Sequence, residues 1–292
     1  MTGARAKLRD RWSWVPARGR IAAGAGTTSS AHWAVVGCSV ICLWLLLISV
    51  PPAKAECAPG ALGTSRVLAV DASTTPRVGR KHFPVSLPLD PKEVVLTFDD
   101  GPWPGTTPKV LDALNRECVK ATFFVLGRNA VSHPDILRRE LSEGHTVAHH
   151  TWSHPLLNRM SLRAAETEID RGIAAVEGVL YGKHAAQPVT PFFRFPGFAS
   201  SRALLDLMAQ RGIVVFGADL WASDWNAMSP DAQLRLVLSR LEHARGGIVL
   251  FHDTKRQTAA MLPAFLRALK ARGFRVVHVV PAKAGSRVGR AD

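Results

Sequence analysis

Short apolar runs alternate with amphipathic stretches from residue 93 to residue 281. The runs are rich in Val, Ile, Leu or Phe, which is typical of strands buried on both faces of a parallel sheet. The expected strands are Glu93–Phe98, Ala121–Leu126, Thr146–His149, Phe192–Arg194, Val214–Phe216, Ile248–Phe251 and Arg275–Val280. Because the stretches between them have helical spacing, the pattern predicts an α/β fold with a parallel sheet covered by helices.

Capping residues support this alternation. Ser161 precedes an amphipathic stretch that extends to about Leu180, and Ser229 with Pro230 starts another helix with proline at its first position. Helix stops are expected at Gly144, Gly212 and Gly273. About seven strand–helix units favour a distorted (β/α) barrel of about seven strands. An open doubly wound sheet is the alternative, but the sequence has no Gly-x-Gly-x-x-Gly phosphate loop to support it.

The first 55 residues differ in composition from the rest of the chain. An Arg-rich start leads to an apolar run at 34–50 and then to Ala53-Lys54-Ala55. This order predicts a signal peptide cleaved after Ala55, although the run is also nearly long enough to be an uncleaved membrane anchor. Either alternative places the remaining residues outside the cytoplasm, secreted or periplasmic, or anchored in the inner membrane by residues 34–50.

The remaining chain divides into three parts. Residues 56–91 are rich in Ala, Pro, Ser and Thr without periodicity, so we expect a linker that wraps onto the domain. The domain is expected over 92–281, and residues 282–292 form a basic tail. Cys57 and Cys118 are the two cysteines outside the apolar run, and the sequence leaves open whether they pair.

Charge narrows the range of partners. The formal net charge is +14, which suits anionic envelope polymers or membrane headgroups. The sequence contains no helix-turn-helix, zinc-finger or aromatic RNA-binding motif, so nucleic acid is not an expected partner. Contact with a membrane is expected only through the N-terminal segment.

Polar residues follow several expected strands directly, and in a barrel the carboxyl ends of the strands share one face. Asp99 and Asp100 end the first strand, and His150 and His154 follow the third at a spacing that aligns both imidazoles on a helical turn. With Asp100, the histidines form a set with open positions, typical of sites for Zn²⁺ or another divalent cation. A solvated turn and surface histidines are the alternative explanations.

Two further polar residues end strands. Arg194 could hold Asp99 ionised through a charge-assisted hydrogen bond, or it could form a structural ion pair. His252 is a candidate general acid, and Asp224 could orient it and stabilise its charge. The alternative for His252 is a core histidine bonded to a carbonyl.

The ordered motifs Thr97-Phe-Asp-Asp-Gly-Pro102, His150-Thr-Trp-Ser-His154, Arg194-Phe-Pro-Gly197, Asp224-Trp225 and Leu250-Phe-His252 are all present. This set resembles the polysaccharide deacetylase family, the NodB-homology or carbohydrate esterase family 4 domain, over about residues 93–280. Ala121–Gly127 is similar to the family's second strand. The resemblance implies a distorted (β/α) barrel, a divalent metal that is often zinc, and removal of N-acetyl or O-acetyl groups from chitin-like polymers or peptidoglycan.

The resemblance also implies roles for single residues. Asp99 is then the base, and His252 the acid that protonates the leaving amine. The expected metal ligands are Asp100, His150 and His154. The expected partner is an acetylated polysaccharide or oligosaccharide.

Two positions depart from the family pattern. Gly197 and Phe198 follow Pro196 where a Tyr is usual; the Gly197 N–H can still face the oxyanion, but the tyrosine's contacts with substrate are lost. His149 stands where Asn is common, and is either a donor behind the ligands or an additional ligand. Five aromatic residues could offer apolar faces to sugar rings, or most of them could simply belong to the core: Trp103, Trp152, Trp221, Trp225 and Phe198.

Two other functions remain open. A cyclic-amide hydrolase on the same scaffold is disfavoured by the signal segment, because such small-molecule enzymes are usually cytoplasmic. A catalytically silent carbohydrate-binding domain is disfavoured because every expected ligand and acid–base residue is present.

Overall fold

The computed structural model describes residues 57–182 and 187–282. The expected signal or anchor over residues 1–55 lies outside the described residues, as does nearly all of the basic tail. Among the helices of the described part, none is long and apolar enough to cross a membrane.

The described part of the chain contains ten strands whose pairings are all parallel. The strands are β1 (Thr64–Val70), β2 (Arg77–Val78), β3 (Glu93–Asp99), β4 (Thr122–Val125), β5 (Thr146–His149), β6 (Phe192–Phe193), β7 (Val214–Phe216), β8 (Leu220–Trp221), β9 (Gly247–His252) and β10 (Arg275–Pro281). Their order is β1-β10-β3-β4-β5-β6-β7-β2, with β9 between β3 and β8. The expected parallel α/β fold is confirmed.

Seven of these strands match the expected runs, and three do not. The free edges of β8 and β2 do not pair with each other, so hydrogen bonds between the described strands do not close the barrel. Strands β1 and β2 lie in the segment expected to be a linker. Exposed and more buried positions alternate in β1, which pairs along its length with β10. Its apolar positions are mixed with Thr, Ser and Arg, which hid the strand pattern.

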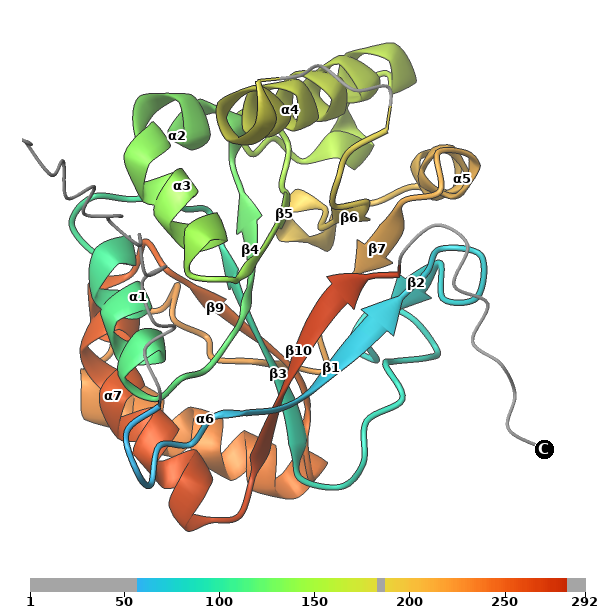
Figure 1. Cartoon of the computed structure of the whole chain (residues 1–292). Helices are drawn as coiled ribbons and strands as arrows, with labels where there is room; N and C mark the ends of the chain where they lie inside the picture. The colour runs from blue at the N-terminus through green and yellow to red at the C-terminus, as the bar shows by residue number, and fades with distance from the viewer. Residues whose placement is uncertain (1–56, 183–186, 283–292) are drawn as a thin grey trace, which may run out of the picture. The chain divides into compact units, whose positions relative to one another are not determined.

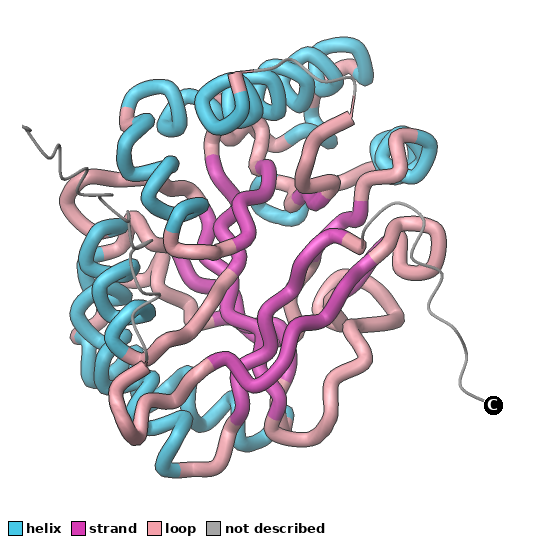
Figure 2. Tube along the Cα trace, viewed as in Figure 1, coloured by secondary structure: helices cyan, strands magenta, loops and turns pink. Residues whose placement is uncertain are grey.

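The helices lie around the strands, as Figures 1 and 2 show. They are α1 (Thr107–Arg116), α2 (Gly127–Ser132), α3 (Pro134–Ser142), α4 (Leu162–Tyr181), α5 (Arg202–Gln210), α6 (Pro230–Ala244) and α7 (Arg256–Ala271). The expected caps are confirmed, since Ser161 Oγ accepts from the N–H of Ala164 and Ser229 Oγ accepts from the N–H of Ala232. Such caps each stabilise a helix by about 1 kcal/mol.

Alternate residues of the strands bury two different faces. Val94, Leu96 and Phe98 of β3 join the core formed with helices α1, α6 and α7. Val95 instead joins an interior group with Phe124, Ala148 and other strand residues. A further core lies beneath α4 and α5. Side chains alternate between the two faces of a strand with a period of two. The last residue of a strand therefore points to the interior only if it lies an even number of positions from the other interior residues.

A disulfide joins Cys57 to Cys118, which answers the question the sequence left open. It attaches the start of the described chain to the loop that follows α1. Strand β1 begins seven residues after Cys57, and the N–H of Gly63 also bonds to the carbonyl of Glu117. The segment preceding the expected domain is therefore part of the same compact unit.

Candidate active site

Two adjacent carboxylates end β3 and line one cavity. Asp99 shares the interior face of β3 with Val95, because side chains two residues apart point the same way. Asp100 follows with a φ of 76°, a left-handed conformation uncommon outside glycine. At Gly101 the chain passes so close to Asp253 that a Cβ would lie 2.0 Å from Oδ2. A tight turn thus presents both carboxylates to the cavity.

Asp100, His150 and His154 form a candidate metal centre. Asp100 Oδ1 lies 3.6 Å from His150 Nε2 and 3.4 Å from His154 Nε2, and one donor atom from each residue lies within 4.8 Å of the others. Oδ1 is buried without a hydrogen-bond partner among the described residues, which is costly unless a cation or water meets it. Two imidazoles and one carboxylate with open positions suit a divalent cation, so the donor set fits the expected metal.

The hydrogen bonding of His150 also suits a metal ligand. Its Nδ1 lies 2.7 Å from the backbone oxygen of Arg194; because a carbonyl only accepts, Nδ1 carries the hydrogen and Nε2 presents its lone pair. Burial lowers the pKa of His150 to about 3, despite the opposing charge of Asp100. The imidazole is therefore neutral, as a ligand is required to be.

The turn that carries His154 is not the helical turn expected from the spacing of the two histidines. Residues 150–155 are irregular, and Thr151 and His154 have φ values of 69° and 70°. The His154 N–H bonds to Thr151 Oγ1 at 3.1 Å. Two left-handed residues in one short turn place the imidazole beside that of His150, with ring centroids 5.1 Å apart.

Arg194 is fully buried and holds Asp99. Its Nη1 donates to Asp99 Oδ1 at 2.6 Å and to Thr97 Oγ1 at 2.9 Å, while Nη2 and Nε donate to backbone carbonyls at the end of β7. This leaves Asp99 Oδ2 facing His150 Nε2 at 3.8 Å. Burial raises the pKa of Asp99, and the charge and hydrogen bond of Arg194 offset only part of this rise. The sequence alone suggested that Arg194 would dominate the pKa of Asp99 and hold the carboxylate ionised.

His252 forms a second pair, with the buried Asp224. Asp224 Oδ1 lies 2.7 Å from His252 Nδ1, while Oδ2 accepts from the His252 N–H and from Thr258 Oγ1, both at 2.7 Å. Burial opposes a charge on His252, but Asp224 and the carboxylates of Asp99 and Asp100 outweigh it and raise the pKa to about 9. With Nδ1–H held by Asp224, Nε2 lies 3.9 Å from Asp100 Oδ2. A protonated imidazole therefore faces the metal centre.

The metal centre and His252 lie on the wall of a cavity of about 540 Å³, which we call the catalytic cavity. The lining includes Asp99, Asp100, His150, His154 and His252, together with Phe195, Gly197, Phe198, Trp221, Trp225, Leu250, His82 and Lys255. Trp225 is 47% exposed at the mouth of the cavity, and its ring is 5.9 Å from that of His252. The structure thus brings together all the expected metal and catalytic residues, with Arg194 and Asp224 directly behind the cavity.

Gly197 occupies a position where a side chain would require Leu156 to move. Its φ is 55°, in the left-handed region that favours glycine, and a Cβ there would lie 2.9 Å from Leu156 Cδ2. Phe198 follows, also with a positive φ of 56°, and its ring lines the cavity. The turn thus contributes a phenylalanine ring to the cavity one position after the family's usual tyrosine.

His82 was missed by sequence reasoning. It lies in the segment 56–91, lines the catalytic cavity, and stacks on Phe198 with ring centroids 3.7 Å apart. Burial, with Arg194 and Lys81 nearby, lowers its pKa to about 4, so the imidazole is neutral. No motif surrounds His82 in the sequence; only the parallel pairing of β2 with β7 brings it here.

Two expected assignments do not fit the structure. His149 points away from the metal centre, and its Nε2 lies 3.5 Å from Glu177 Oε1 of α4; it is not a member of the ligand set. Trp152 does not line the catalytic cavity, and its ring is covered by the guanidinium of Arg171 at 3.8 Å. Trp103 lines a neighbouring hollow beside Asp100 and His154.

Comparison with known proteins agrees with this geometry. The sequence pattern described as Polysaccharide deacetylase matches residues 86–216. A peptidoglycan-N-acetylglucosamine deacetylase of Listeria monocytogenes is 33% identical over 228 residues, which cover 76% of this chain and 47% of that protein. The chain thus spans about half the length of the first relatives it matches. A chitooligosaccharide deacetylase of Bradyrhizobium is 32% identical, covering 65% of this chain and 90% of that protein.

Solved structures lead to the same conclusion. A peptidoglycan deacetylase of Bdellovibrio bacteriovorus superimposes with a TM-score of 0.68 at 30% identity, covering 81% of this chain and 65% of that one. The fold, the ordered motifs and a relative matched over 90% of its own length agree with one another. The chain belongs to the polysaccharide deacetylase family.

Proposed function

We propose that this protein removes acetyl groups, N-acetyl groups in particular, from an envelope or chitin-like glycan. One observation carries the proposal. The three metal-ligand side chains, the Asp99–Arg194 pair and the His252–Asp224 pair converge on a single cavity. A cavity of about 540 Å³ lined by aromatic rings and a few polar groups suits part of a sugar chain.

The residues divide the reaction between them. A divalent cation held by Asp100, His150 and His154, with zinc our first choice, would polarise the acetyl carbonyl and lower the pKa of water. Asp99, fixed through Oδ1 by Arg194, accepts the proton of the attacking water on Oδ2. The Gly197 N–H faces the developing oxyanion. His252 then donates its Nε2 proton to the leaving amine, while Asp224 holds Nδ1–H.

We also propose that the protein works outside the cytoplasm. The Arg-rich start, the apolar run 34–50 and Ala53-Lys54-Ala55 support a signal peptide or an anchor. The disulfide between Cys57 and Cys118 suits an oxidising compartment. Sequencing the N-terminus of the protein from envelope fractions tests this proposal. Glu56 as the first residue supports cleavage, and an intact N-terminus in the soluble cytoplasm overturns the location.

Acetate release tests the activity. The full chain, loaded with zinc, is incubated with N-acetylated chitooligosaccharide, peptidoglycan and acetylated xylan, with Asp100→Ala as the inactive control. Acetate from either of the first two supports N-deacetylation, and acetate from xylan alone points to ester hydrolysis. Binding of these glycans without acetate release would support the silent binding domain, and hydrolysis of cyclic amides alone would support the other hydrolase.

A further inference from the structure

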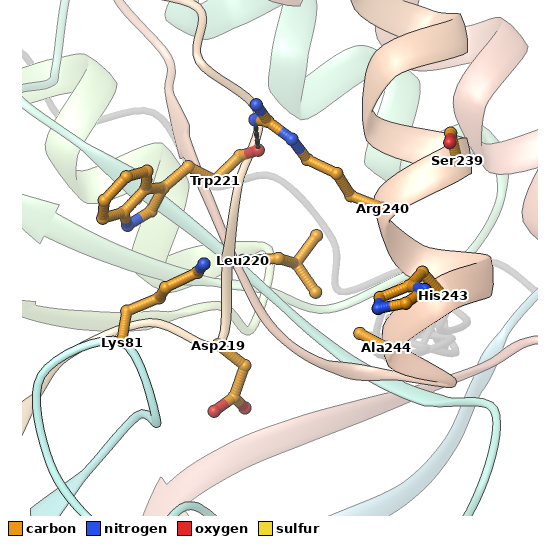
Figure 3. Close-up of a pocket in the computed structure, with 8 residues that line it drawn as sticks. All are labelled: Lys81, Asp219, Leu220, Trp221, Ser239, Arg240, His243 and Ala244. Atoms are coloured by element: carbon orange, nitrogen blue, oxygen red, sulfur yellow. Dashed lines mark hydrogen bonds between the residues drawn. The ribbon is translucent and has the colours of Figure 1, made fainter.

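A second pocket adjoins the catalytic cavity. It has a volume of about 570 Å³ and lies between β8, the C-terminal half of α6 and the side chain of Lys81 (Figure 3). Trp221 of β8 lines both this pocket and the catalytic cavity. None of the motifs in the sequence falls on Lys81, Arg240 or His243, which supply its basic groups.

The positive groups of this pocket lack acidic partners. Arg240 Nη1 donates to the backbone oxygen of Trp221 at 2.6 Å and to Ser223 Oγ at 2.7 Å. Its Nη2 and Nε make no hydrogen bond, and neither Arg240 nor Lys81 forms an ion pair, within residues 57–182 and 187–282. Lys81 is exposed and holds its Nζ 5.3 Å from the centre of the Trp221 ring. Both cations therefore remain available to an anion.

The single carboxylate of the pocket is already occupied. Asp219 Oδ1 accepts from the Arg80 N–H, and Oδ2 accepts from Ser86 Oγ and the Ile248 N–H, at 2.6 to 2.8 Å. Figure 3 shows this carboxylate at the opposite end of the pocket from the guanidinium of Arg240. Both oxygens of this carboxylate are turned to the backbone and to Ser86, whereas Lys81 and Arg240 line the pocket beside Trp221.

The pocket lies within reach of a glycan bound at the metal centre. The Trp225 ring is 5.9 Å from the His252 ring and 5.9 Å from the Trp221 ring, and Trp221 carries Lys81 on its face. A sugar chain that presents an acetyl group to Asp99 and His252 can extend along these aromatic faces toward Lys81 and Arg240. The guanidinium of Arg240, with its free N–H groups, and the exposed ammonium of Lys81 suit a carboxylate.

We propose that this pocket binds a carboxylate carried by the glycan beside the acetylated sugar, so that the protein prefers acidic glycans to neutral ones. The proposal rests on the deacetylase function proposed above, because it assigns a second contact to the same substrate. Lys81 and Arg240 are the binding residues, and Trp221 forms the wall shared with the catalytic cavity.

The test compares one oligosaccharide in two forms. A short peptidoglycan fragment with free carboxylates is measured against the same fragment with its carboxylates converted to amides. The full chain carries wild-type sequence, Lys81→Glu, or Lys109→Glu, an exposed lysine of α1, as the matched control. Lys81 is exposed, so its substitution does not threaten folding. The readout is the ratio of kcat/KM for the acid form to kcat/KM for the amide form.

We expect the wild-type ratio to exceed one and to fall about tenfold in Lys81→Glu, the scale of one lost charged contact. Raising the ionic strength lowers the wild-type ratio, because salt screens exposed charges. Lys109→Glu keeps the wild-type ratio. Equal ratios in wild type and Lys81→Glu, or no preference for the acid form, overturn the proposal.

Binding separates this proposal from the proposed function. Calorimetry measures the affinity of both fragments for the full chain of each variant without turnover. One outcome is that no acetate is released, but the acid form binds more tightly and Lys81→Glu abolishes this difference. That outcome contradicts the deacetylase function and supports the carboxylate-binding role of the pocket. If acetate is released from both forms at equal efficiency, the deacetylase function is supported and the carboxylate-binding role of the pocket is contradicted.

Discussion

The ends of strands β3 and β5 each carry two adjacent residues with functional chemistry, but they use them differently. At the end of β3, Asp99 and Asp100 both line the catalytic cavity. At the end of β5, His150 lines the cavity, whereas His149 points the other way, toward Glu177 of α4. The two dipeptides look alike in the sequence.

Backbone conformation accounts for the difference. His149 is the last residue of a regular strand, so it points opposite to Ala148, which belongs to the interior core. Asp99 occupies the interior face of β3. The φ of 76° at Asp100 turns the Asp100 side chain to the same side. A left-handed residue costs about 1–3 kcal/mol, so such turns are expected where function requires them. Two residues that are adjacent at the end of a strand therefore need not belong to the same site.

The largest effect is expected from Asp100→Ala. Removing this carboxylate leaves two imidazoles, which are too few ligands for a stable divalent site. We expect stoichiometric metal and acetate release both to be lost, while the far-ultraviolet circular dichroism stays native. Metal analysis after dialysis measures the first effect. Full metal content in Asp100→Ala would show that the assigned centre is wrong.

Asp99→Asn comes next. The amide keeps an oxygen that can accept from Arg194 but cannot take a proton, so kcat should fall about a hundredfold or more, the usual scale for a general base. Metal content should stay near the wild-type value, which distinguishes this variant from Asp100→Ala. Near-normal turnover with metal bound would mean that another residue is the base. His149 is not that residue, because it faces Glu177.

The pH dependence of kcat/KM tests the role of His252 as the proton donor. Its pKa is raised from 6.5 to about 9, and a proton donor is active only below its pKa, so kcat/KM should fall as pH rises through this range. A cation on Asp100 would remove part of that support, so the falling limb should lie below about 9. Asp224→Asn should shift the limb to lower pH, because it removes the charge that supports protonation. An unchanged limb in this variant would contradict the pairing.

Replacement of His82 by Ala should act mainly on substrate binding. The ring lines the cavity and stacks on Phe198, and it does not belong to the candidate ligand group. Loss of one ring contact costs about 0.5–1.5 kcal/mol, so KM should rise several-fold while kcat changes little. Steady-state kinetics on N-acetylated chitooligosaccharide measure the two constants separately. A loss confined to kcat would assign His82 to the chemical step.

The smallest effect on activity is expected from His149→Gln. The side chain lies behind β5, so kcat should stay within about twofold of wild type. His149 is buried beside Glu177, and neither ring nitrogen has a hydrogen-bond partner among the described residues. The cost of the substitution should therefore fall on stability, within the about 0.5–3 kcal/mol typical of single substitutions. Thermal unfolding measures this cost. A loss of metal or a large loss of kcat in the folded variant would return His149 to the site and remove the contrast between the two strand ends.

Local sequence was sufficient for much of this description. Apolar runs located seven strands, because burial on both faces requires continuous apolar residues. Ser161 and Ser229 located helix starts, because a side-chain oxygen satisfies free N–H groups there. The proximity of Asp100, His150 and His154 and the pairs Asp99–Arg194 and His252–Asp224 were also predictable, because parallel strands bring their carboxyl ends together.

Tertiary structure alone decided the rest. Strand β1 and His82 lie in a segment without periodicity, and only pairing with β10 and β7 orders them against the domain. The opposite directions of His149 and His150, and the dominance of burial over Arg194 in the pKa of Asp99, depend on which atoms surround each group. Residue types and spacings determine which chemistry is available, whereas the direction and desolvation of a side chain arise from contacts between distant segments.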